Sequence, residues 1–264
     1  MLNLPLLSLL LAATWPEPAS GLSSDKASFP AGFGVHKVYV DAGHGAANNP
    51  GNTSAFCLEE QAEMLRIATD LQQRLEATGH FEVKLSRQPG QLTEYKARVA
   101  EAKAWGAEVF VSLHSDARGQ ASTWSPEPGK ACETVDGQDG FSVLYSDEGS
   151  PELAGRRQDL ALALGEGLSG AGFPPYRGQW YGDLYAEHPD EPGVFLDTHE
   201  PAKRIMVLRR PEMASVIIET HQAWDPQEPL RWQEEATLAA FADAVSGGLV
   251  AFFEAEPSEA VTEP

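Results

Sequence analysis

The sequence predicts one α/β domain, a twisted, mostly parallel or mixed sheet of about six strands with helices on both faces. Apolar, β-rich stretches alternate with amphipathic helical stretches along most of the chain. In addition, residues able to bind metal or move protons follow directly after several of the predicted strands. A chain of 264 residues with 42% hydrophobic content can bury one sizeable core.

The first half of the chain alternates strand, helix, strand, helix and strand. Strands are expected at residues 35–41, 81–86 and 108–113, and helices at 59–77 and 92–105. The first helix shows apolar residues at helical spacing and a glycine as its stop signal, namely Met64, Ala68, Leu71, Leu75 and Gly79. This alternation favours a sheet that is covered on both faces.

The second half departs from this rhythm at two long segments. Residues 117–140 and 170–203 are predicted to be irregular insertions near the functional site, and loops of this length inside a compact domain are usually functional or mobile. The regular elements expected between and after them are strand 141–145, helix 151–168 started by Ser150 and Pro151, strands 205–208 and 215–218, and helix 232–253. Together with the first half they form one domain over residues 35–254.

Both ends of the chain lie outside this domain. Residues 1–21 are predicted to be a signal peptide, because an apolar stretch too short to cross a bilayer is followed by small residues. The acidic end at 255–264, rich in Pro and Glu, is expected to be disordered. We therefore expect an exported protein, periplasmic or extracellular. No later apolar stretch approaches the length of a membrane span, so no membrane span is expected.

The charge and the cysteines restrict the partners and the compartment. A formal net charge of -20 repels polyanions, so nucleic acid and anionic lipid headgroups are poor partners. The two cysteines, Cys57 and Cys132, leave two interpretations open. They form a disulfide in an oxidising compartment, or they stay free thiols in a reducing one.

Three predicted strands end in a residue that can bind metal or move protons, and these residues are His44, His114 and Glu219. Sites in open α/β sheets form where the carboxyl ends of strands meet the loops, so parallel strands would bring the three side chains together. In the first helix, Glu60 shares a face with the apolar residues, whereas Glu59 lies on the polar face. Glu60 is therefore the better candidate for a fourth member.

Two imidazoles and one carboxylate suit a catalytic zinc, which keeps a fourth position open for water. His44, Glu60 and His114 are the predicted ligands of one Zn²⁺ per chain, and Glu219 remains as the base. His221, two residues past Glu219, is the main competing histidine, in a supporting or substrate-binding role.

Four fragments occur in order and in the expected strand and helix contexts: Val40-Asp41-Ala42-Gly43-His44-Gly45, Glu60, Phe110-Val111-Ser112-Leu113-His114-Ser115-Asp116, and Ser215-Val216-Ile217-Ile218-Glu219. Together they resemble the zinc-dependent N-acetylmuramoyl-L-alanine amidase family of the amidase 3 catalytic type, between residues 38 and 253. The resemblance implies a mixed sheet with flanking helices, one Zn²⁺ held by His44, Glu60 and His114, and Glu219 as catalytic carboxylate. It also implies hydrolysis of the amide between muramic acid and the L-alanine of peptidoglycan stem peptides.

The chain departs from the family pattern at a few positions. Ala46 stands where a second Gly is usual, Asp116 stands where Asn is usual, and residues 220–224 differ from the common continuation. None of these changes removes an expected ligand or the catalytic carboxylate. They therefore bear on substrate details more than on activity.

Further residues are candidates for substrate contacts or for support of the site, and they are Arg87, Arg98, Asp116 and His221. An ion pair within the fold is the other interpretation for both arginines. The aromatic run Trp180, Tyr181 and Tyr185 has two interpretations as well. It stacks on sugar rings, or it holds its own loop in place.

Peptidoglycan is the expected partner of such a protein. The segment 170–203 leaves autoinhibition open, and an activator protein would then be necessary. Two alternative functions also stay open: a zinc hydrolase on another peptidic amide, and a catalytically silent wall-binding or regulatory module of the same fold. The presence of His44, Glu60, His114 and Glu219 together argues against the silent module.

Overall fold

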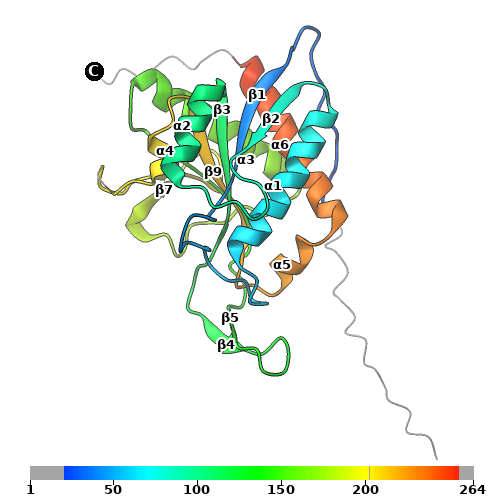
Figure 1. Ribbon diagram of the computed structural model, residues 1–264, viewed down its shortest axis with the longest axis vertical. Helices are drawn as coiled ribbons and strands as arrows, with labels where there is room; N and C mark the ends of the chain where they lie inside the picture. The colour runs from blue at the N-terminus through cyan, green and yellow to red at the C-terminus, as the bar shows by residue number, and fades with distance from the viewer. Residues whose placement is uncertain (1–20, 202, 256–264) are drawn as a thin grey trace, which may run out of the picture.

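The computed structural model describes residues 21–201 and 203–255 (Figure 1). Seven strands form the main sheet in the order β2-β1-β3-β9-β6-β8-β7. Their bounds are β1 (His36–Ala42), β2 (Phe81–Leu85), β3 (Val109–Asp116), β6 (Ser142–Tyr145), β7 (Tyr185–Glu187), β8 (Val194–Asp197) and β9 (Ala214–Gln222). A separate hairpin consists of β4 (Ser122–Trp124) and β5 (Cys132–Thr134). The expected α/β class with a mixed sheet is confirmed.

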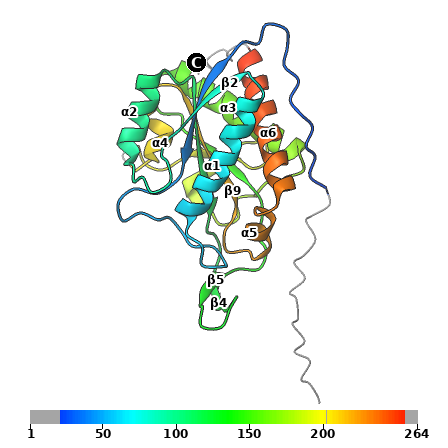
Figure 2. The ribbon, with the colours of Figure 1, turned by 45° about the vertical axis from the view of Figure 1, so that its right-hand side comes forward.

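Helices cover both faces of this sheet (Figures 1 and 2). The helices are α1 (Glu60–Ala77), α2 (Tyr95–Trp105), α3 (Pro151–Gly170), α4 (Met206–Arg209), α5 (Gln227–Arg231) and α6 (Glu235–Glu254), with a 3-10 turn η1 (Gly182–Leu184). On β3, Val109, Val111 and Leu113 pack toward α1, α3 and α6, whereas Phe110 packs toward α2 and α4. Two hydrophobic cores result, because successive strand residues point to opposite faces.

The strand register aligns the positions that carry chemistry. Strands β1, β2, β3 and β9 run parallel, and β6 joins β9 in the antiparallel sense. Ala42 pairs with Leu113, Leu113 pairs with Ile218, and His114 pairs with Glu219. Strands β1, β3 and β9 therefore end at one edge of the sheet, called the carboxyl edge below. The β4–β5 hairpin projects from the body of the molecule on this side (Figure 1).

Three expectations for the second half need correction. Residues 205–208 were expected as a strand but lie mostly in α4, and a four-residue apolar run carries too little periodicity to separate the two structures. The segment 170–203 contains β7 and β8, and β8 is an internal strand of the main sheet with Val194 and Phe195 buried. The segment 117–140 contains the β4–β5 hairpin. By contrast, α3 begins as expected, since Leu153 N donates to Ser150 Oγ (3.2 Å).

The last helix differs from the expectation on apolar stretches. By length and composition, α6 is apolar enough to cross a membrane, which no segment after the predicted signal peptide was expected to be. It packs as a core helix against α1 and α3, and 67% of its apolar window is buried. Apart from residues 21 and 255, the predicted signal peptide and disordered tail lie outside the described residues.

Candidate metal and catalytic site

The turn after β1 carries His44 at the carboxyl edge. His44 has a φ of 57°, a left-handed conformation that residues with side chains rarely adopt, and Gly45 follows with a φ of 72°. Gly43 is required for space, because a Cβ there would lie 2.4 Å from Leu113 O and 2.6 Å from the His114 ring. This close approach brings the His44 and His114 rings within 4.8 Å, centroid to centroid.

Arg98 of α2 is fully buried and holds this turn in place. Its Nη1 pairs with Asp41 Oδ1 (2.8 Å) and donates to Ala42 O (3.1 Å), while its Nη2 donates to His44 O. A guanidinium offers five donors in a fixed fork, which suits several acceptors on one turn. For Arg98, the structure therefore shows the ion pair within the fold and a positioning contact to His44.

Arg87 holds the same turn from the end of β2. Its Nε donates to Ala42 O (3.0 Å), and its Nη2 donates to Gly43 O (3.0 Å) and to Gln61 O (2.5 Å). A Cβ on Gly45 would lie 2.7 Å from Arg87 Nε, so the glycine makes this contact possible. Among the described residues no carboxylate pairs with Arg87, so its role here is to bind carbonyl oxygens.

The first turn of α1 decides which glutamate faces the histidines. Glu60 is 3% exposed and lies beside both imidazoles, whereas Glu59 is exposed. A Cβ on Gly51 would lie 2.5 Å from Glu60 Oε2, so this glycine leaves room for the carboxylate. The inward direction expected for Glu60 from helical periodicity is the one that the structure shows.

The Glu60 carboxylate is fully engaged. Asn52 N donates to Oε2 (2.9 Å) and Ser115 N donates to Oε1 (3.1 Å). His44 Nε2 lies 3.1 Å from Oε2, and His114 Nδ1 lies 3.0 Å from Oε1. Burial alone would raise the pKa of Glu60, but the hydrogen bonds from His114 and His44 outweigh it and hold the pKa well below its ordinary value. Glu60 is therefore ionised.

His44, Glu60 and His114 form a compact donor set that could hold a metal ion. One ligand atom from each lies within 4.8 Å of the others. Asn49 Oδ1 lies 2.9 Å from His44 Nδ1, which leaves His44 Nε2 facing Glu60. The buried Nε2 of His114 has no hydrogen-bond partner among the described residues. Two imidazoles, one of them with an unpartnered ring nitrogen, and a carboxylate fit zinc, whose catalytic sites use three protein ligands.

Glu219 lies on β9, opposite His114 in the β3–β9 register. As a whole, Glu219 is only partly buried. Its Oε2 atom, however, is closed off from solvent and has no hydrogen-bond partner in the described part of the chain. Burial raises the pKa of Glu219 well above its ordinary value, and the charges of Asp116 and Glu60 raise it further. The result is an unpaired carboxyl placed beside the donor set.

Asp116, at the end of β3, belongs to a network on the Glu219 side. Tyr181 OH donates to Asp116 Oδ2 (2.7 Å) and lies 2.9 Å from Ser142 Oγ. Arg118 Nη1 lies 3.6 Å from the same Asp116 oxygen. Ser142 is in turn the β6 partner of Glu219. The network ties the segment 170–203 to the site through Tyr181.

His221 does not join the donor set. It is 2% exposed, its Nδ1 lies 2.8 Å from Thr220 Oγ1, and its ring stacks on Trp232 at 5.3 Å. Burial lowers its pKa to about 3. His221 is therefore a neutral core residue beside the site, and the structure gives it no contact with the two other histidines.

Several functional contacts were missed from the sequence. Asn49 Nδ2 donates to Tyr95 OH (3.0 Å), and that hydroxyl lies 3.4 Å from His44 Nδ1, so both residues orient the first histidine. Asn52 supports Glu60 through its backbone. The Asn-rich loop before α1 was the available signal, because Asn side chains commonly bond to groups nearby in a turn. Nothing local marked Tyr95.

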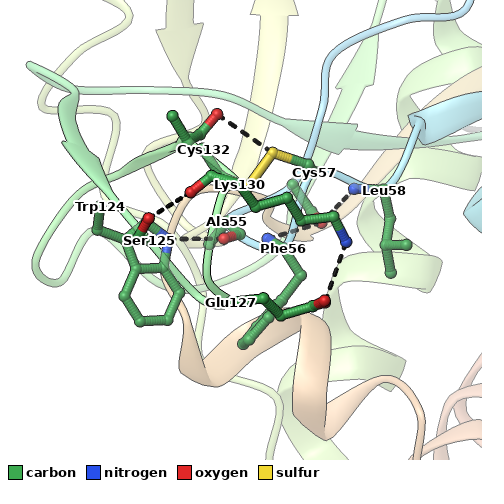
Figure 3. The surroundings of a disulfide bond; sticks show 11 residues. Ala55, Phe56, Cys57, Leu58, Trp124, Ser125, Glu127, Lys130 and Cys132 are labelled. Atoms are coloured by element: carbon green, nitrogen blue, oxygen red, sulfur yellow. Dashed lines mark hydrogen bonds and ion pairs between the residues drawn. A yellow bond between two sulfur atoms is a disulfide. The ribbon is translucent and has the colours of Figure 1, made fainter.

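A disulfide joins Cys57 to Cys132, whose Cα atoms are 5.4 Å apart (Figure 3). It links the loop that precedes Glu60 to the β4–β5 hairpin. Trp124 Nε1 donates to Ala55 O (2.6 Å), so a hydrogen bond joins the same two segments. Of the two interpretations of these cysteines, the structure shows the pair.

Comparisons with known proteins bear on the family. A family model described as N-acetylmuramoyl-L-alanine amidase matches residues 38–251. The chain is 38% identical over 80 residues to the N-acetylmuramoyl-L-alanine amidase AmiC of Neisseria meningitidis serogroup B, covering 30% of this chain and 19% of that protein. It is 33% identical over 84 residues to the N-acetylmuramoyl-L-alanine amidase CwlM of Bacillus licheniformis, covering 31% and 32%. The matches thus span less than a third of these relatives.

Solved structures share the fold over most of the chain. The N-acetylmuramoyl-L-alanine amidase from Clostridium difficile 630 superposes with a TM-score of 0.61 at 20% identity, covering 83% of this chain and 96% of that one. The apo form of Ami1 from Mycobacterium abscessus gives 0.62 at 18% identity, covering 83% and 99%. These identities establish the fold alone, but the family model covers His44, Glu60, His114 and Glu219 together. The chain therefore belongs to the N-acetylmuramoyl-L-alanine amidase family of the amidase 3 type.

Proposed function

We propose that this chain is an exported, zinc-dependent N-acetylmuramoyl-L-alanine amidase. Its substrate is the amide between the lactyl group of muramic acid and the L-alanine of the peptidoglycan stem peptide. The observation that carries the proposal is a donor set within 4.8 Å, made of His44, Glu60 and His114, with the unpaired carboxyl of Glu219 opposite His114. Membership of the family supports the reaction and the substrate.

The proposed chemistry divides between the two sides of the site. His44, Glu60 and His114 would hold the zinc, which would act as a Lewis acid on the carbonyl and would lower the pKa of a bound water to about 7. Glu219 takes a proton from the attacking water and returns it to the leaving nitrogen, so that the C–N bond breaks and a free amino terminus forms. Asn49 and Arg98 keep His44 in the orientation that this arrangement needs.

The proposed location is outside the cytoplasm, periplasmic or extracellular. Peptidoglycan lies there, and the Cys57–Cys132 disulfide fits an oxidising compartment. The predicted signal peptide at residues 1–21 would deliver the chain to it.

A partner protein is the second component to test. One solved structure with this fold is the CwlD amidase from Clostridioides difficile in complex with the GerS lipoprotein, with a TM-score of 0.56 at 19% identity. For this chain, an activator protein is part of the proposal because the segment 170–203 contacts the Glu219 side of the site through Tyr181.

The decisive experiment measures the release of stem peptides from purified muropeptides, with zinc quantified in the same sample. We expect new L-alanine amino termini and about one zinc per chain. The variant Glu219→Gln should keep the zinc and lose the release, because it removes the proton acceptor and no ligand.

Other results would redirect the proposal. Bound zinc without cleavage would point to another peptidic amide as substrate or to a missing activator. Adding cell-envelope extract to the cleavage assay would test for the activator. A protein that binds walls without zinc and without cleavage would be the silent module. A protein without zinc under any loading condition would overturn the proposal.

A further inference from the structure

In the segment that begins at Tyr176, some aromatic side chains are buried and one is exposed. Tyr176 and Tyr181 are 2% and 9% exposed, whereas Trp180 is 50% exposed. The hydroxyl of Tyr176 accepts a hydrogen bond from Trp180 N (2.6 Å), and the Arg118 guanidinium lies 3.7 Å from the Tyr176 ring centroid. Tyr181 is held by its bonds to Asp116 and Ser142 described above. The two tyrosines therefore anchor the segment, and the Trp180 indole is left outside.

Trp180 stands beside the Glu219 side of the site. Its Nε1 lies 3.8 Å from the position that a Cβ would take on Gly119, three residues after Asp116. The described residues expose large hydrophobic side chains at Val35, Leu58, Leu92, Trp180 and Leu184, and Trp180 is the aromatic member of this group. The exposed Trp180 indole is an aromatic surface beside the site, and such a surface can stack on a flat apolar face of a ligand.

A second group meets Trp180 at the same place. Gln138 Cγ lies 3.9 Å from the same Gly119 position. Gln138 has a φ of 70°, which is unfavourable for a residue with a side chain, and such strain is found preferentially at functional positions. Its Oε1 is buried and has no hydrogen-bond partner among the described residues. The Gln138 side chain therefore lines the wall beside Trp180, and the indole is left as the group that a ligand can reach.

The charges around this pair disfavour an anionic ligand. The carboxylates of Asp116 and Glu219 are nearby, while the cations of this region are engaged. Arg118 lies 3.6 Å from Asp116 and donates to Gly140 O, and Arg177 pairs with Glu187 at 3.3 Å. The free carboxylates of a stem peptide would find no available cation here. A sugar ring is neutral and presents both an apolar C–H face and hydroxyl donors.

We propose that Trp180 forms a sugar-binding subsite that holds a ring of the glycan strand next to the Glu219 side of the site. Trp180 stacks on the apolar face of the ring. This inference rests on the proposed function, and it adds that the segment 176–187 recognises the sugar side of the scissile amide.

The first test compares a substrate that contains sugar with one that does not. One is a muropeptide polymer with intact glycan, and the other is a lactyl peptide without any sugar. Trp180→Ala should raise KM for the polymer about tenfold, as loss of a central Trp contact typically does, and leave kcat and the sugar-free substrate unchanged. Trp180→Phe should restore most of the affinity, because it keeps an aromatic face. Val35→Ala, which removes an exposed apolar side chain far from the site, is the matched control.

The second test separates this inference from the proposed activity. Glu219→Gln is expected to bind without turnover, so its affinity for peptide-free glycan strands is measured by isothermal titration calorimetry, alone and combined with Trp180→Ala. Loss of glycan binding in the double variant supports the subsite even if no amide is cleaved. Equal KM values for Trp180→Ala and the unmodified protein, together with equal glycan binding, overturn it. If the double variant still binds glycan, and Trp180→Ala weakens only the binding of a protein partner, the inference is overturned as well.

Discussion

The two sides of the site hold one carboxylate each, and the fold treats them in opposite ways. Glu60, on the α1 side, accepts two backbone N–H groups and faces two imidazoles, and its pKa is lowered. Glu219, on the β9 side, has an oxygen without a partner and a raised pKa. The same chemical group is held ionised in one place and is shifted toward its protonated form in the other, because the environment differs.

The supports behind the two sides also differ. The Glu60 side is held by a covalent link, the Cys57–Cys132 disulfide, just before α1. The Glu219 side is held by hydrogen bonds that Tyr181 makes to Asp116 and Ser142. The side that we propose to bind metal is thus held by a covalent link, and the side that we propose to contact sugar is held by non-covalent bonds. Substitutions on each side should therefore affect different measurements.

The largest effect should come from replacing each of the two carboxylates in turn with an amide. Glu219→Gln should lower kcat about 10³-fold with zinc retained, because it removes a general base and leaves the ligands intact. Glu60→Gln should lose zinc and, with it, activity, because a neutral amide replaces an anionic ligand. Zinc content by atomic emission and kcat on muropeptides check both. Zinc loss in Glu219→Gln, or full zinc occupancy in Glu60→Gln, would reverse the two assignments.

Removal of the disulfide should test the covalent frame. The double change Cys57→Ser and Cys132→Ser should lower the free energy of unfolding by about 2 to 4 kcal/mol, since the link closes a long segment of chain. Urea unfolding followed by circular dichroism measures this loss. Zinc affinity should fall in the same variant because the loop before Glu60 is released. Ser125→Ala, in the same hairpin, is the control, and equal stability of all three proteins would contradict the role of the link.

Asn49 should affect zinc affinity more than stability. Asn49→Ala removes the oxygen that lies 2.9 Å from His44 Nδ1, so zinc affinity should fall about 10- to 100-fold, as is typical for loss of a group that orients a ligand. Competition with a zinc chelator measures the change. Asn49→Asp keeps an acceptor oxygen and should restore most of the affinity. Equal affinities for the alanine and aspartate variants would show that the contact is not needed.

A third buried carboxyl, that of Glu228, lies outside the site. Its pKa should therefore affect the stability of the protein without affecting catalysis. Burial raises the pKa of Glu228 in α5 to about 7, despite its bond to Arg231 (2.5 Å). The folded protein therefore holds this proton more tightly than the unfolded chain. For this group, stability is highest below the ordinary carboxyl pKa, falls as pH rises toward 7, and stays reduced above it.

Glu228→Gln should remove that part of the pH dependence. Relative to the unmodified protein, the variant should be about equally stable at pH 4 and about 1 to 2 kcal/mol more stable at pH 8, with kcat unchanged. Urea unfolding at both pH values measures the difference. A variant that is less stable at pH 8 would show that the bond to Arg231 outweighs the cost of burying the charge.

Local patterns predicted much of the fold and the candidate site. Helical periodicity distinguished Glu60 from Glu59, and the positions after apolar strands marked His44, His114 and Glu219. These signals are local because a strand end and a helix face are set by a few neighbouring residues. The same method failed at 205–208 and missed β8, where short apolar runs lie among loop-forming residues and carry no clear period.

Other features depend on residues that are far apart in the chain. Cys57 and Cys132 are 75 residues apart, and Tyr181 reaches Asp116 across 65 residues. No periodicity relates such positions, so their contact could not be inferred before the strands were placed next to one another.

The sequence by itself determined the fold class, the two imidazoles and the two carboxylates, because each depends on patterns within a single strand or helix. Only the tertiary structure decided that the cysteines pair, that Arg87 and Arg98 hold the turn at His44, and that His221 is a core residue. It also divided the aromatic run, burying Tyr181 and leaving Trp180 exposed. The physical reason is that burial and hydrogen bonding of a side chain depend on which distant segments pack around it.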